Sequence, residues 1–149
     1  MLALFQNNRH KYHDEILNNI KDNLYRKNRY HFDFALAIAV CDTNISMHKF
    51  QSSIRDTDKF IRLEDNLCTV VLDGISSSSA IKASTNLQAK FESEYFREKL
   101  YISVIDSSEN HQDTNGYKMI NSLLDVLEYS ISNNISNEVV DYYQMECQG

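Results

Sequence analysis

Acidic and amide side chains stand at two points of the sequence where they could hold a metal ion. Asp42 follows an aliphatic run, and Glu64, Asp65 and Asn66 separate two short β-prone runs. If the aliphatic run and the second β-prone run are neighbouring strands, carboxylates from both points face one cation, and Mg²⁺ prefers such oxygen ligands. Asp and Asn are also the residues that turns prefer, so two solvated turns are the competing interpretation.

A second chemical pattern precedes the first β-prone run. Arg55 and Asp58 stand in an Arg-x-x-Asp pattern. A guanidinium offers a planar fork of donors to a phosphate or a guanine edge, and a carboxylate can accept from guanine N1 and N2. The same spacing recurs between Arg62 and Asp65, and an exposed ion pair contributes only about 0 to 1 kcal/mol to stability. The pattern therefore indicates either a ligand site or a surface ion pair.

Hydrophobic spacing predicts the elements that position these residues. Apolar residues at every fourth position predict an amphipathic helix over about residues 8–26. Alternating large and small apolar residues predict a strand over residues 32–40 that is buried on both faces, and a short helix follows over 47–54. The other predicted elements are a hairpin of residues 59–63 and 67–72, a helix from the serine tract 76–79 to about residue 96, a strand at 100–105, a helix at 120–131 and a strand at 139–143.

The order of these elements predicts the fold class. Between residues 32 and 105 it is strand, helix, strand, strand, helix, strand. This order is typical of an α+β fold with a ferredoxin-like βαββαβ antiparallel sheet and flanking helices. The polar stretch at 106–116 is predicted to be a loop. The length of 149 residues, with 42% hydrophobic and 24% charged residues, predicts one domain over residues 1–149.

Composition argues against several functional classes. The net charge of −6 argues against non-specific binding to nucleic acid or to an anionic membrane. Three cysteines without a CxxC pair predict neither a disulfide framework nor a zinc site, and three glycines exclude a glycine-rich phosphate loop. The longest aliphatic run is far shorter than the roughly 20 residues of a membrane span. We therefore expect a cytoplasmic protein without membrane insertion.

From Arg55 onward the order of residues resembles that of GGDEF domains, which make cyclic di-GMP from two GTP molecules. In that family an arginine and an aspartate precede a strand, the GGDEF hairpin and an apolar strand. Here Arg55 and Asp58, residues 59–63, the hairpin Glu64-Asp65-Asn66-Leu67-Cys68 and residues 69–72 stand in the same register without gaps. The resemblance covers residues 8–142, and its further matches are Asn8, Arg9, Asp42, Leu124, Asp125, Tyr129, Asn137 and Val139.

The hairpin departs from the family's pattern at the positions that serve catalysis. Glu64 and Asp65 replace the two glycines that let GTP phosphates approach the main chain. Asn66 replaces the metal-binding acid and Leu67 the glutamate after it, so Asp42 is the only carboxylate left among the metal's ligands. Two-metal phosphoryl transfer needs more carboxylates than this. The resemblance therefore implies a domain without catalytic residues, metal or cofactor.

Other departures concern GTP binding. The segment after Asp42 that carries the family's guanine-recognising groups is missing, and Ser132 replaces a phosphate-touching lysine. GTP held as an effector without turnover is a third interpretation. These losses oppose it, and so do two hairpin acids beside a triphosphate.

Two functions remain for such a domain. The resemblance places Arg55 and Asp58 at the family's inhibitory site, where an arginine and an aspartate grip cyclic di-GMP, so an inactive receptor for this dinucleotide is expected. The family's additional arginine from the next helix is not matched, because Gln88 falls near that position and Lys90 is the nearest cation. The alternative is a regulatory or dimerising module without a small ligand. Such a module would form a homodimer or belong to a larger signalling chain beside a domain such as a phosphodiesterase.

Overall fold

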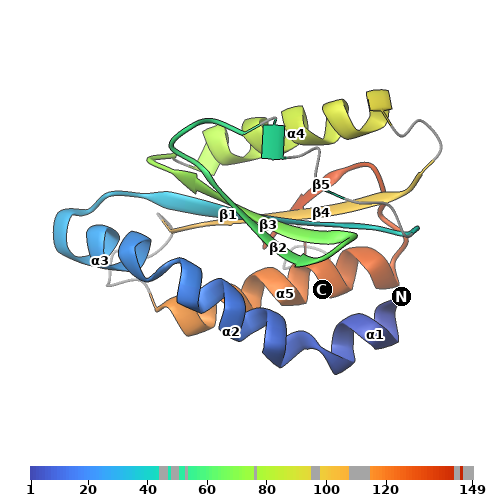
Figure 1. Ribbon diagram of the computed structural model, residues 1–149, viewed down its shortest axis with the longest axis horizontal. Coiled ribbons are helices and arrows are strands. Elements are labelled where there is room, and N and C mark those ends of the chain that lie inside the picture. Colours follow the sequence, from blue (N-terminus) through green and yellow to red (C-terminus); the bar gives the residue numbers. More distant parts are fainter. Residues whose placement is uncertain are drawn as a thin grey trace.

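The computed structural model describes residues 1–43, 47, 51–52, 54–75, 77–94, 98–107, 115–142 and 145. Within this part of the chain, a five-stranded sheet lies between two layers of helices (Figure 1). Residues 48–50 and 53 of the predicted short helix at 47–54, and residues 108–114 of the predicted loop at 106–116, lie outside the described residues. None of the helices in the described ranges is both long enough and apolar enough to cross a membrane.

The four strands predicted for the ferredoxin-like sheet are present and lie in the expected order. β1 (Phe34–Cys41) is its central strand and pairs antiparallel with β3 (Leu67–Asp73) and with β4 (Leu100–Asp106). β2 (Lys59–Glu64) forms a hairpin with β3 at one edge. β5 (Val139–Asp141) adds to the other edge, parallel to β4, and gives the strand order β2-β3-β1-β4-β5. The predicted α+β class is therefore confirmed, with β5 as an extension of the ferredoxin-like sheet.

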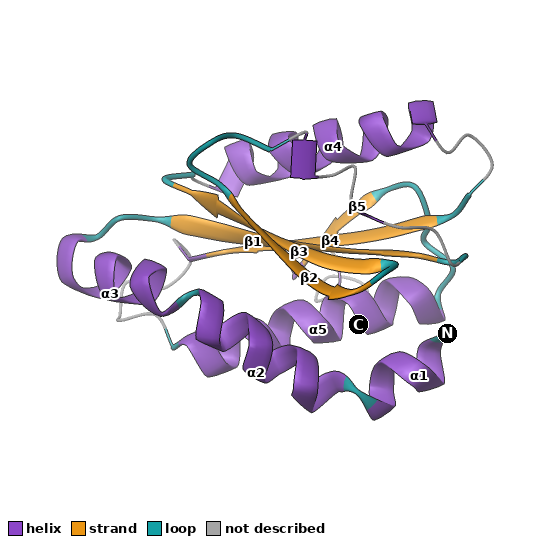
Figure 2. Cartoon of the chain, in the orientation of Figure 1, coloured by secondary structure: helices purple, strands orange, loops and turns teal. Residues whose placement is uncertain are grey.

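The two faces of β1 divide the core into two clusters. All eight residues of β1 are buried. Its large side chains, Phe34, Leu36, Ile38 and Val40, pack in one cluster with α2 (Arg9–Asn19) and α5 (Gly116–Ser132). Its alanines and Cys41 face the other cluster, beneath α4 (Ser77–Glu94). Figure 2 shows α4 on one face of the sheet and α2 and α5 on the opposite face.

The leading segment is bent rather than straight. The sequence predicts one helix over residues 8–26, whereas the structure has α1 (Leu2–Asn7), α2 and α3 (Lys21–Tyr30). The break lies at Ile20, whose φ of −113° and ψ of 11° leave the helical range. Ile20 is nevertheless fully buried, like Ile16. The predicted apolar stripe is therefore continuous through the bend, and the bend keeps it against the core.

The alternation along β1 predicts an asymmetric response to enlargement. Ala37 is 2% exposed beneath α4, and Ile38 is fully buried on the other face. We expect Ala37→Leu to lower the free energy of unfolding by about 1 to 3 kcal/mol, because extra methylenes do not fit a closed core. The control is Ile38→Leu, which conserves volume and should cost less than about 1.5 kcal/mol. Urea unfolding would contradict this assignment if Ala37→Leu were no less stable than Ile38→Leu.

Candidate functional site

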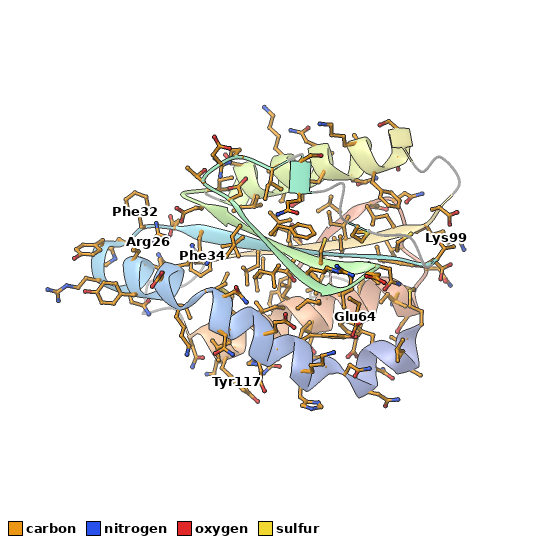
Figure 3. The ribbon with its side chains drawn as sticks, viewed as in Figure 1. Arg26, Phe32, Phe34, Glu64, Lys99 and Tyr117 are labelled. Carbon is orange, nitrogen blue, oxygen red and sulfur yellow. The ribbon has the colours of Figure 1, made fainter. Side chains whose placement is uncertain are left out.

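The hairpin turn and the end of β1 lie together, as the sequence predicts. Asn66 joins them by two hydrogen bonds with Cys41: the Cys41 amide donates to the Asn66 carbonyl at 2.9 Å, and Asn66 Nδ2 donates to the Cys41 carbonyl at 2.9 Å. The next amide, of Asp42, donates to the Lys99 carbonyl at 3.0 Å. Asp42 therefore stands beside the hairpin at one end of the sheet, the end at which Figure 3 labels Lys99.

Both acids of the hairpin have a cationic partner. Glu64 Oε1 accepts from Tyr12 Oη at 3.2 Å and lies 3.4 Å from Lys11 Nζ. Asp65 forms an ion pair with Arg62. Burial of the phenol, and then the charge of Glu64, raise the pKa of Tyr12 to about 12. The hairpin is consequently less negative than its sequence indicates, and it is clamped to α2.

The hairpin closes without the conformations that favour glycine. Its turn is Asp65-Asn66, and among the described residues a positive φ occurs only at His31, Gly74, Asn134 and Asn137. A bulge at the Arg62–Glu64 step of β2 accommodates the turn instead. Side chains thus stand where glycines would leave the main chain bare to a phosphate.

The remaining hairpin positions do not fit a divalent cation. Leu67 and Cys68 are 2% and 1% exposed and belong to the core, and burial raises the pKa of the Cys68 thiol to about 12. The amide nitrogen of Asn66 is turned toward Cys41. No group of three His, Cys, Asp or Glu side chains that could hold a metal occurs in the described ranges. Within the described residues, the Mg²⁺ interpretation of Asp42 and the hairpin is therefore not supported by a cluster of ligands.

Arg55 and Asp58 form an ion pair beside Asp73, at the end of β3 away from the hairpin turn. The Asp58 carboxylate accepts from Arg55 Nε at 3.1 Å and from Arg55 Nη2 at 2.7 Å. The same carboxylate accepts from the Arg55 amide at 3.0 Å, so it also closes the turn between the two residues. The Asp58 side chain is only 3% exposed, whereas that of Arg55 is 52% exposed. Asp58 thus holds the arginine in place, and the hydrogen bond raises the pKa of Arg55.

Asp73 connects this pair to the leading helices. Its amide donates to Asp58 Oδ1 at 3.3 Å, and its carbonyl accepts from Arg55 Nη2 at 2.9 Å. Its carboxylate accepts from Arg26 Nη1 at 3.0 Å and from Asn23 Nδ2 at 3.2 Å. One residue at the end of β3 therefore touches both the Arg-x-x-Asp turn and α3.

A cavity of about 310 Å³ opens beside Arg55. Its lining residues are Ile54, Arg55, Asp58, Leu72, Ala83, Asn86, Leu87 and Lys90. Lys90 thus shares a wall with Arg55, while Gln88 is directed elsewhere, toward the Asn137 carbonyl and Glu92. Within the described residues no acidic side chain pairs with Lys90. The cavity joins the guanidinium of Arg55, the ammonium of Lys90 and the amide of Asn86 to apolar side chains.

One cavity residue, Asn86, and one linking residue, Asp73, were not predicted from the sequence. Asn86 lies one helical turn before Lys90, so the i, i+4 spacing along α4 could have grouped the two. Asp73 could be recognised only as the end of a strand, because its partners Arg26 and Asn23 lie 47 and 50 residues away.

Matches of the resemblance at opposite ends of the chain meet in space. Arg9 Nη2 lies 2.6 Å from Asp125 Oδ1, and Arg9 Nη1 lies 2.8 Å from Glu128 Oε1. Burial of the guanidinium opposes its charge, but the hydrogen bonds to Glu128 and Asp125 outweigh this effect and raise the pKa of Arg9. Asn137 adopts a φ of 59° and binds both polar main-chain groups of Leu100 before β5 begins.

No family model matches the sequence, and no curated protein matches it. Solved structures do match the fold. The GGDEF domain of PA1120 (TpbB or YfiN) from Pseudomonas aeruginosa has a TM-score of 0.68 at 15% identity, covering 88% of this chain and 89% of that chain. The active GGEEF domain of a diguanylate cyclase from Vibrio cholerae has a TM-score of 0.65 at 17% identity, with 84% and 92% covered. The GGDEF domain of DgcB from Caulobacter crescentus, in complex with c-di-GMP, has a TM-score of 0.61 at 8% identity, with 85% and 87% covered. The chain therefore has the fold of GGDEF domains, as the resemblance implied.

The clamp between Tyr12 and Glu64 predicts a pH dependence of stability. The unfolded chain ionises a tyrosine near pH 10, whereas Tyr12 in the fold ionises at about 12. A raised pKa stabilises the fold below pH 10, and this contribution is lost as the pH rises from about 10 to 12. We expect Tyr12→Phe to reduce the fall in unfolding free energy over this range.

The control is Tyr25→Phe, since Tyr25 is 61% exposed. Urea unfolding at several pH values should give Tyr25→Phe the slope of the unmodified chain. If Tyr12→Phe also kept that slope, the buried phenol would not be the group that titrates.

Proposed function

We propose that this chain is a catalytically inactive GGDEF-like signalling domain that binds cyclic di-GMP in the cavity beside Arg55. The observation that carries the proposal is the arrangement of Arg55: the buried carboxylate of Asp58 fixes its guanidinium on the wall of a 310 Å³ cavity that Lys90 also lines. A half-exposed, oriented guanidinium is suited to a phosphate or to a guanine edge.

The chemistry of the cavity matches the parts of such a ligand. Two phosphodiesters carry two negative charges, and the cavity is lined by Lys90 and by Arg55, whose charge is shared with Asp58. Asn86 offers both a donor and an acceptor to the edge of a base. Leu72 and Leu87 offer apolar surface to its face. Asp58 serves as a positioning residue, because its oxygens are already occupied by Arg55 and by backbone amides.

The hairpin supports the absence of cyclase activity. Its acids hold Tyr12, Lys11 and Arg62, and its last two residues are packed in the core. Phosphoryl transfer to a GTP 3′-hydroxyl depends on positioned metal ions and on phosphates that approach the main chain. Among the described residues at this end of the sheet there is no group of three metal-ligating side chains, which supports the proposed inactivity.

A regulatory module without a small ligand is the second candidate function. The link from Arg55 through Asp73 to Arg26 favours it, since this link joins the leading helices to the far side of the sheet. Such a module would report the position of α3 to a second copy or to a neighbouring signalling domain.

Titration calorimetry with cyclic di-GMP tests the receptor function. We expect binding by the unmodified chain and a loss of about tenfold or more in Lys90→Gln, because a charge-assisted hydrogen bond is removed. Lys90 is the cleaner position to change, since Arg55 also supports its own turn. Lys82→Gln, an exposed site on α4 outside the cavity, should bind normally.

GTP serves as the parallel ligand and is expected to bind more weakly than cyclic di-GMP. If neither nucleotide bound, the receptor function would be rejected and the regulatory module would remain. Equal binding by Lys90→Gln and the unmodified chain would place the ligand outside this cavity.

A cyclase assay tests the proposed inactivity separately. With GTP and either Mg²⁺ or Mn²⁺, we expect no cyclic di-GMP above a blank reaction, because the hairpin offers no set of metal ligands. The measurement is chromatographic detection of product over several hours. Product formation at a few turnovers per hour would overturn the proposal of an inactive domain.

A further inference from the structure

A second cavity adjoins the first and shares Arg55 with it. It has a volume of about 510 Å³ and is lined by His31, Phe32, Asp33, Arg55, Gly74, Ile75 and Ser79. The two cavities are lined by residues that are close in the sequence: Leu72 lines the first, and Gly74 and Ile75 line the second. Arg55 therefore stands between two hollows.

Phe32 is an exposed aromatic residue on the wall of this second cavity. It is 55% exposed, whereas Phe34, two residues later, is fully buried. Figure 3 shows Phe32 near Arg26, at the end of the sheet opposite the Glu64 hairpin. An exposed aromatic ring on the wall of a cavity offers a flat face on which a planar group of a ligand can stack.

The backbone around Phe32 is held in place. The Phe32 amide donates to the Arg26 carbonyl at 3.3 Å, and the amide of Gly74 donates to the Asp33 carbonyl at 2.9 Å. A Cβ placed on Gly74 would lie 3.9 Å from Phe32 Cε1, so the ring lies over the glycine. The ring is thus presented from a fixed main chain.

The charges of the second cavity are compensated. Asp33 Oδ1 lies 2.8 Å from Lys27 Nζ. Arg55 stands at the boundary, with its side chain half exposed. An aromatic ring and a guanidinium in one cavity suit a nucleotide. The base can stack on the ring, and the phosphate can pair with the arginine.

We infer that Phe32 stacks against the second guanine base of cyclic di-GMP, while Arg55 holds a phosphate between the two cavities. The inference rests on the proposed function and extends it to specificity. A ligand with two bases and two phosphates can occupy both hollows at once, whereas a mononucleotide can occupy only one. The second cavity therefore selects a dinucleotide.

The test compares Phe32→Ala with Phe32→Tyr in titration calorimetry. A base stacked on an aromatic side chain gives a loss of about 5- to 150-fold on substitution by alanine. We expect Phe32→Ala to lose cyclic di-GMP affinity within that range, and Phe32→Tyr to retain it. The affinity for GMP, measured in parallel, should be the same in all three chains because GMP fills the cavity beside Lys90. Tyr30→Ala, an equally exposed aromatic residue that lines neither cavity, is the matched control.

The outcomes separate this inference from the proposed function. If Lys90→Gln lost binding and Phe32→Ala kept it, the receptor function would stand and the stacking role would be rejected. If the unmodified chain bound no cyclic di-GMP, both would be rejected. A loss of GMP affinity in Phe32→Ala equal to the loss for cyclic di-GMP would also overturn the selection of a dinucleotide.

Discussion

The complete burial of β1 is the constraint on which the rest of the structure depends. Eight consecutive residues lie between two layers of helices, with large side chains on one face and small ones on the other. Polar chemistry is therefore excluded from the middle of the strand and can occur only where it starts and ends. Asp42 and the hairpin lie at one end, and Phe32 and Asp33 lie at the other. The two candidate regions are separated because the strand between them is closed.

Many acids of this acidic chain have cationic partners within the fold. Glu64, Asp65 and Asp33 pair with Lys11, Arg62 and Lys27. The carboxylate of Asp58 is occupied by Arg55, and that of Asp73 by Arg26. Lys90 lies outside these pairs and faces the cavity. A net charge of −6 is thus compatible with a local site for an anion.

The sequence allowed most of the sheet to be predicted, because local patterns determine it. The period of two predicted β1 to within two residues at each end. The polar residues between β2 and β3 predicted the hairpin to within one residue. The bend at Ile20 could not be predicted, because the apolar stripe runs through it without interruption. The place of Asp73 also escaped prediction, since its contacts depend on how α3 lies against the end of β3. Residues that act through distant partners carry no local signal.

Asp73 contacts both the Arg55 region and the leading helices. Its backbone binds Arg55 and Asp58 while its carboxylate binds α3, so one residue is in contact with both regions. A coupling free energy between two sites acts equally in both directions. If binding in the proposed site strengthens the docking of α3, then the docking of α3 strengthens binding by the same factor.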